Sequence, residues 1–204
     1  MKLLSVIVFC ALTISSLFAQ ELTLDACRHA LKSALQLNHR DSLAAAYCHL
    51  GEYYAYRNSD SARCYFEKGL NHVRRADVSL YCTLLINLAE TYFAKGELDE
   101  AVRRFRFACR EVDQLQADVE YQVTALSSLG VIYRRQAMPD SALVCYTQAL
   151  QALETVDMPD EKSYLLTNIA ILYANMKRME EGRYYIEKAM EQVEHCQDLD
   201  MVMY

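Results

Sequence analysis

Small and aromatic residues follow one another at fixed intervals along this chain. In residues 87–109, the order is Ala89, Tyr92, Ala101, Phe105 and Ala108. Spacings of three and four residues place side chains on one face of a helix, and the wider gap between Tyr92 and Ala101 leaves room for a turn. Small residues let two helix backbones approach closely, and aromatic rings fill the space beside them. The pattern therefore predicts a pair of antiparallel α-helices.

The same pattern occurs four times. Each copy has a small residue, a tyrosine three residues later, a second small residue, a bulky residue and a third small residue. In chain order these are Gly51, Tyr54, Ala62, Phe66 and Gly69; Ala89, Tyr92, Ala101, Phe105 and Ala108; Gly130, Tyr133, Ala142, Tyr146 and Ala149; and Ala170, Tyr173, Gly182, Ile186 and Ala189. The second small position recurs after 39, 41 and 40 residues. Only the first copy is one residue shorter between its first two small positions.

These copies resemble the tetratricopeptide repeat, whose signature is Leu-Gly-x-x-Tyr followed by Ala-x-x-x-Phe. The first halves read LGEYY, LAETY, LGVIY and IAILY, and the second halves read ARCYF, AVRRF, ALVCY and GRYYI. The resemblance implies an all-α fold, a right-handed α-solenoid of antiparallel helix pairs with a period of about 40 residues. We expect an extra helix within residues 20–40, four repeats over residues 41–197, and the start of a further, truncated helix over residues 198–204.

The period exceeds the ~34 residues of the usual tetratricopeptide repeat. In the repeat that these copies resemble, a proline follows the second helix. The corresponding residues here are Arg74, Asp113, Glu154 and Glu194. Because proline is absent there, we expect each second helix to continue for about one further turn.

The first nineteen residues have a different character. Lys2 precedes an apolar stretch, and Ala19 is a small residue immediately before Gln20. This arrangement is typical of a secretory signal peptide cleaved after Ala19, and the apolar stretch is short for a membrane span. We therefore expect a bacterial protein of exported type, located in the periplasm, with no integral membrane span in the mature chain.

Composition excludes several kinds of chemistry. All five glycines occupy repeat or turn positions, so none remains for a phosphate-binding loop or a GxSxG motif. The histidines and cysteines lack the CxxC and HxxxH spacings of metal sites. We predict no catalytic residues, no metal and no cofactor. The seven cysteines after residue 19 fit burial as small apolar side chains better than disulfides, although pairing stays open in an exported protein.

The charge pattern argues against nucleic acid as a partner. The chain carries a formal net charge of −6, which repels a phosphate backbone. Residues 103–110 (RRFRFACR) look like a basic patch. However, Asp99 and Arg103, and Glu100 and Arg104, are spaced for ion pairs along one helix, which favours a solvated helix face.

The resemblance implies one functional surface, the concave groove formed by the first helix of each pair. By analogy with the family, the residues facing it are Glu52, Asn87, Glu90, Phe93, Arg134, Asn168 and Ile171. Such a mixed surface suits an extended peptide or a partner helix. Repeats that clamp a terminal carboxylate use Lys, Asn and Arg there, and Glu52 and Glu90 contradict that arrangement.

The C-terminal end is predicted to be open. Asp198 stands where the preceding repeats have Asp77 and Asp118, so residues 198–204 look like the entry to a fifth first helix. A helix so short would leave an apolar edge at Tyr184, Met190, Val193 and Met201. Self-association, a partner, or residues of a longer parent protein would then cover that edge.

The preferred interpretation is an exported, non-catalytic interaction scaffold that binds a protein or peptide in its groove. The alternative is a fragment of the extracytoplasmic sensor region of a bacterial histidine kinase or helix-turn-helix regulator, since such arrays resemble those regions.

Overall fold

The computed structural model describes residues 23–202, and side chains as far as residue 193. All regular structure in this range is helical, which confirms the predicted all-α repeat fold. The elements are α2 (Leu24–Leu37), α3 (Arg40–Ala55), α4 (Ser59–His72), α5 (Val78–Ala94), α6 (Leu98–Leu115), α7 (Val119–Arg135), α8 (Pro139–Ala152), the short 3-10 helix η1 (Leu153–Thr155), α9 (Pro159–Asn175) and α10 (Met179–Val202). The signal peptide predicted over residues 1–19 lies outside the described residues.

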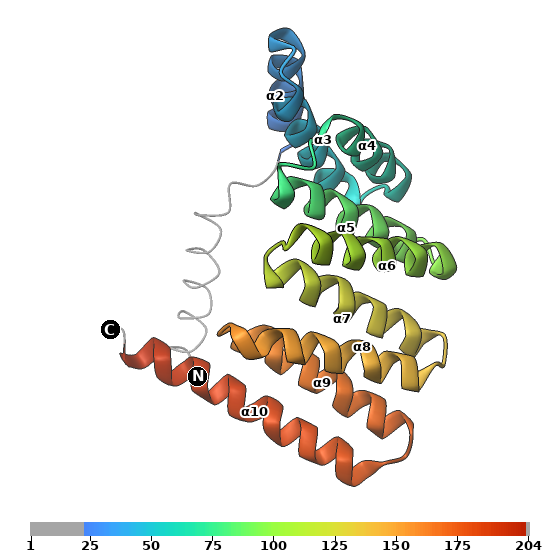
Figure 1. Cartoon of the computed structure of the whole chain (residues 1–204), viewed down its shortest axis with the longest axis vertical. Helices are drawn as coiled ribbons and strands as arrows, with labels where there is room; N and C mark the ends of the chain where they lie inside the picture. Colours follow the sequence, from blue (N-terminus) through green and yellow to red (C-terminus); the bar gives the residue numbers. More distant parts are fainter. Residues whose placement is uncertain (1–22, 203–204) are drawn as a thin grey trace, which may run out of the picture.

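The helices stack as successive antiparallel pairs, with α2 at one end and α10 at the other (Figure 1). The first helices α3, α5, α7 and α9 each pack on the second helices α4, α6, α8 and α10 of their own repeat. First helices of neighbouring repeats also contact one another: α3 meets α5, α5 meets α7 and α7 meets α9. The first helices therefore form the inner layer of the stack, and the second helices form its outer layer.

The small positions lie where helices meet most closely. Ala101, Ala142 and Ala149 are fully buried. Gly130 shows why a small residue is needed, because a Cβ atom added there would lie 2.4 Å from Cε1 of Tyr146. Tyr146 is itself fully buried, so its ring has no free space into which to move. The bulky position of a repeat thus packs directly on the small position of the preceding helix.

The turns inside the last three repeats share one backbone feature. Gly96, Ala137 and Lys177 each have a positive φ, between 56° and 77°. The first repeat has no such residue in its turn, residues 56–58. Its first helix ends four residues after Gly51, whereas α5 ends five residues after Ala89. This difference accounts for the one-residue shortening seen in the sequence.

The long period has more than one structural origin. Helices α6 and α10 continue past Asp113 and Glu194, as expected without proline. Helix α4 instead ends at His72, so residues 73–77 form a longer connection, and α8 gives way to η1 before Glu154. The prediction that every second helix extends is therefore wrong for the first and third repeats. At α4, an extended residue, Val73, ends the helix and buries its side chain in the core.

The expected start of a new helix at residues 198–204 is wrong for the part that is described. Helix α10 is continuous from Met179 to Val202, because no glycine or proline interrupts residues 183–202. The predicted exposure of Tyr184, Met190 and Val193 is confirmed, whereas the side chain of Met201 lies outside the described residues. Ile186 is also exposed, unlike its counterparts Phe66, Phe105 and Tyr146, because no further first helix covers α10 in the described chain.

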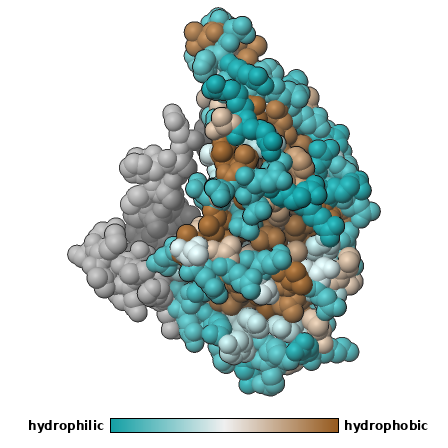
Figure 2. Space-filling model, viewed as in Figure 1, coloured by the Kyte–Doolittle hydropathy of each residue, from teal (hydrophilic) through white to brown (hydrophobic). Residues whose placement is uncertain are grey.

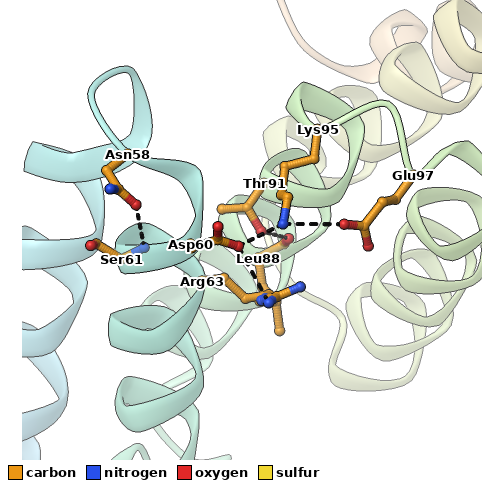
Figure 3. A network of polar contacts seen from close by, with 8 residues as sticks. All are labelled: Asn58, Asp60, Ser61, Arg63, Leu88, Thr91, Lys95 and Glu97. Atoms are coloured by element: carbon orange, nitrogen blue, oxygen red, sulfur yellow. Dashed lines mark hydrogen bonds and ion pairs between the residues drawn. The ribbon is translucent and has the colours of Figure 1, made fainter.

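Polar contacts join the turns of successive repeats (Figure 3). Lys95, after α5, donates a hydrogen bond of 2.6 Å to Asp60 in the first turn of α4. In the next repeat Gln136 donates to Asp99 at 3.2 Å. Asp60 and Asp99 both lie in the first turn of their helices. Asn58, not Asp60, caps α4, since its side chain accepts from the Ser61 amide.

Candidate functional site

Three of the seven predicted groove residues come together in one pocket of the inner layer. Glu52 lies on α3, and Asn87 and Glu90 lie on α5. All three line a cavity of about 170 Å³, with Phe66 and Tyr56 among its other walls. Phe66 is buried, whereas Tyr56 is almost fully exposed. The pocket therefore combines carboxylates, an amide and aromatic surface between the first helices of two repeats.

The two carboxylates of this pocket have no cationic partner in the described part of the chain. Glu52 only accepts a weak hydrogen bond from the Cys48 thiol, at 3.5 Å. Glu90 is an exposed residue, but protein atoms surround its carboxyl closely enough that desolvation raises its pKa. A carboxylate that has lost water without gaining a cation is stabilised when a cation approaches. The pocket is thus an acidic site that favours a positively charged group.

A second inner pocket lies between α7 and α9. Arg134 lines it with Leu172, Asn175 and Met176, and its volume is about 260 Å³. Nε of Arg134 and the neighbouring hydroxyl of Tyr146 are both buried away from solvent behind this pocket. Burial raises the pKa of Tyr146, and the neighbouring Arg134 opposes part of that rise. Arg134 is only half-buried, so its guanidinium can donate from the pocket wall to carbonyl or carboxylate oxygens of a bound segment, whereas the fully buried Tyr146 cannot.

The remaining predicted residues separate. Phe93 is half-buried, and the guanidinium of Arg135 lies 4.4 Å from its ring centroid. Ile171 is exposed on α9. Asn168 is buried, and its amide donates to the Tyr164 carbonyl in the same helix. The structure therefore removes Asn168 from the open surface, because its polar group is already satisfied within α9.

A larger cavity lies on the outer layer, and the sequence did not predict it. It has a volume of about 560 Å³ between α6 and α8, with α7 as its floor. Its side chains are Arg106, Cys109, Arg110, Leu126, Leu129, Tyr133, Asp140, Ser141, Val144, Cys145 and Gln148. We call this cavity the outer groove. The sequence signal for this groove is the RRFRFACR segment, whose charge spacing predicts a solvated helix face.

Of the two ion pairs expected on α6, the one between Glu100 and Arg104 forms and the one between Asp99 and Arg103 does not. Arg103 and Arg104 both pair with Glu100. Asp99 does not pair with Arg103, because it accepts a hydrogen bond from Gln136 of the next repeat. Only the first half of the basic segment is therefore neutralised within the helix, and its second half borders the outer groove.

The cysteines of the described residues lie in different environments. The six described cysteines are free thiols, of which four are buried, as expected for small apolar side chains. Cys64 departs from that expectation, since it is exposed, and Cys196 lies outside the described side chains. Among the described residues there is no group of three potential metal ligands. No helix in that range has the length and apolar character needed to cross a membrane.

Comparisons with known proteins agree with this architecture. Residues 80–155 match the family model described as Tetratricopeptide repeat. The crystal structure of BtubC from P. vanneervenii is similar, with a TM-score of 0.73 and 20% identity over 84% of this chain and 72% of that one. The crystal structure of MamA is similar at a TM-score of 0.64, with 18% identity over 85% of this chain and 90% of that one. At these identities the likeness shows the fold alone. No curated protein sequence matches the chain.

Proposed function

We propose that this chain, a protein built from tetratricopeptide repeats, binds an extended segment of a protein partner along its inner layer. A lysine or arginine side chain of that segment enters the pocket between Glu52 and Glu90. The repeat fold supports a scaffold for protein interactions, and the partner's chemistry is our inference from the acidic pocket.

The observation that carries this proposal is the unpaired state of the two carboxylates. Glu52 and Glu90 belong to different repeats, yet they line one pocket and have no ion pair in the described chain. A bound cation would gain charge-assisted hydrogen bonds from both, and such bonds are stronger than neutral ones. The aliphatic stem of a lysine would at the same time contact Tyr56 and Ala55.

The pocket between α7 and α9 supports a longer path for the bound segment. The guanidinium of Arg134 on its wall complements acceptor oxygens, whereas the pocket between α3 and α5 complements a cation. An extended segment lying across the first helices would therefore present a basic side chain to α3 and α5, and backbone carbonyls to α7. This difference along the inner layer would fix the orientation in which the segment binds.

Binding to an array of short peptides tests the proposal. We expect peptides with a central lysine or arginine to bind, and peptides with norleucine or glutamate there to bind at least about tenfold more weakly, since a hydrogen bond to a charged group contributes roughly 1.5–3 kcal/mol. Replacing Glu90 with glutamine should remove that preference. Glu67→Gln is the matched control, because Glu67 is exposed on the outer helix α4. A preference for acidic peptides, or an equal loss with Glu67→Gln, would refute the acidic anchor.

The scaffold role requires no catalysis, and we propose that the protein acts after export. Support for export comes from Lys2, the apolar stretch that follows, and the small residue Ala19. Amino-terminal sequencing of protein recovered outside the cytoplasm of a bacterial host should give Gln20 as the first residue. Recovery of the chain in the cytoplasm with Met1 intact would contradict export.

A further inference from the structure

The outer groove is an apolar channel bordered by positive charge. Its floor is made by Leu126, Leu129 and Tyr133 of α7, and Val144 of α8 is more than half exposed on its wall. A further cavity of about 460 Å³ shares Cys109, Leu126 and Gln148 with it and adds Gln122, Gln151 and Ala152. The two cavities therefore form one trough between α6 and α8.

Two arginines supply the positive border. Arg106 and Arg110 are one helical turn apart on α6, and both are exposed. Arg106 lies 5.8 Å from the Tyr133 ring, and Arg110 lies 6.0 Å from the Phe107 ring. In the described chain neither arginine is in an ion pair, although Asp140 lines the trough near the start of α8.

The two thiols in the trough do not add charge to it. Burial raises the pKa of Cys109 to about 11 and also raises that of Cys145. Both side chains are therefore protonated at neutral pH and behave as small apolar groups. The trough thus has a neutral apolar floor and a cationic edge.

Helix α10 has the complementary character. Met179, Ile186, Met190 and Val193 are exposed, and their spacing of 7, 4 and 3 residues places them on one stripe of the helix. Glu180, Glu187 and Glu191 lie in a row beside this stripe. Glu180 faces Arg183 at 3.9 Å, whereas Glu187 and Glu191 have no ion pair within the described part of the chain. Lys188 lies away from the stripe, over the Tyr184 ring at 5.1 Å.

We infer that α10 of one copy docks into the outer groove of a second copy of this chain. The apolar stripe of α10 would cover the trough floor, while Glu187 and Glu191 would face Arg106 and Arg110. Both pairs have a spacing of four residues, which is a rise of about 6 Å along a helix. Two helices aligned side by side can therefore form both ion pairs at once. This use of the outer layer is separate from the inner-layer function proposed above.

The two surfaces belong to different parts of one chain, so the contact is between unlike patches. Apolar burial would provide the attraction, and the charge pairs would set the register and exclude misaligned arrangements. The same contact covers the open end of the repeat stack, where Ile186 lacks the cover that Phe66, Phe105 and Tyr146 have.

Charge reversal with rescue tests this contact. Sedimentation velocity of the purified protein over a range of concentrations should show reversible association, in a reducing buffer because Cys64 is exposed. The variant Arg106→Glu/Arg110→Glu and the variant Glu187→Arg/Glu191→Arg should each raise the dissociation constant by about tenfold or more. When the two variants are mixed, opposite charges face each other again, so association between them should return.

The matched control is Arg28→Glu/Lys32→Glu on α2, which reverses two exposed cations at the same spacing. It should associate as the unaltered protein does. Circular dichroism should show all variants to be equally helical, as expected for substitutions at exposed positions. A monomeric unaltered protein, unchanged association after reversal on α6, or failure of the mixed variants to associate would each overturn the inference.

Discussion

At the scale of single residues, the repeat is specified by pairs of unequal size. Tyr146 fills the space above Gly130, and Phe66 does the same above Gly51, where an added Cβ would lie 2.3 Å from the ring. The second repeat has Ala89 with Phe105 and still buries both completely. The small position can therefore be alanine, with its Cβ atom, only in a repeat whose aromatic ring leaves room for that atom.

Enlarging the small positions of the third repeat should destabilise the protein. We expect Gly130→Ala to lower the free energy of unfolding by about 1–3 kcal/mol, because the enclosed Tyr146 ring cannot move away. Ala142→Leu should cost at least as much, since Ala142 is fully buried. Arg103→Ala, on an exposed side chain, should stay within about 0.5 kcal/mol. Urea unfolding measures all three, and similar losses throughout would mean that the helix register is wrong.

At the scale of helices, the sequence predicted the type of element better than where each ends. Spacings of three and four residues located the helices because they record which side faces the core. Where a helix ends depends on whether a residue there packs better in an extended conformation, and the spacing of apolar residues does not show this. Val73 ends α4 by packing into the core, and α10 continues through Asp198 because nothing in that stretch stops it.

The spacing of residues in the sequence also could not predict the contacts between repeats. The prediction paired Asp99 with Arg103 inside one helix, but Asp99 accepts from Gln136 of the next repeat. Asp60 and Lys95 form the equivalent contact one repeat earlier, and Lys95 lowers the pKa of Asp60. Such partners lie more than thirty positions apart in the sequence, so only the stacking of repeats brings them together.

At the scale of the whole molecule, the stack creates two unlike surfaces. The inner layer presents the carboxylates of Glu52 and Glu90, and the outer layer presents Arg106 and Arg110. The inner pocket could be predicted from the residues that the repeat directs inward, although burial removed Asn168 from that set. The outer groove could not, because its volume depends on how far α6 and α8 separate. Figure 2 shows apolar surface between polar helices on the face that it views.

The pH dependence of binding tests the acidic inner pocket most directly. The ligand is the best lysine peptide from the array, with blocked ends and no other titrating side chain, measured by isothermal titration calorimetry. Desolvation raises the pKa of Glu90 in the free protein, so its charge is lost at a higher pH than that of an ordinary glutamate. Affinity should therefore be highest near neutral pH and should begin to fall above the ordinary carboxyl range as the solution is acidified. In Glu90→Gln, affinity should be lower at neutral pH, and this early fall should be absent. An affinity that is independent of pH, or the same profile in both proteins, would contradict the account.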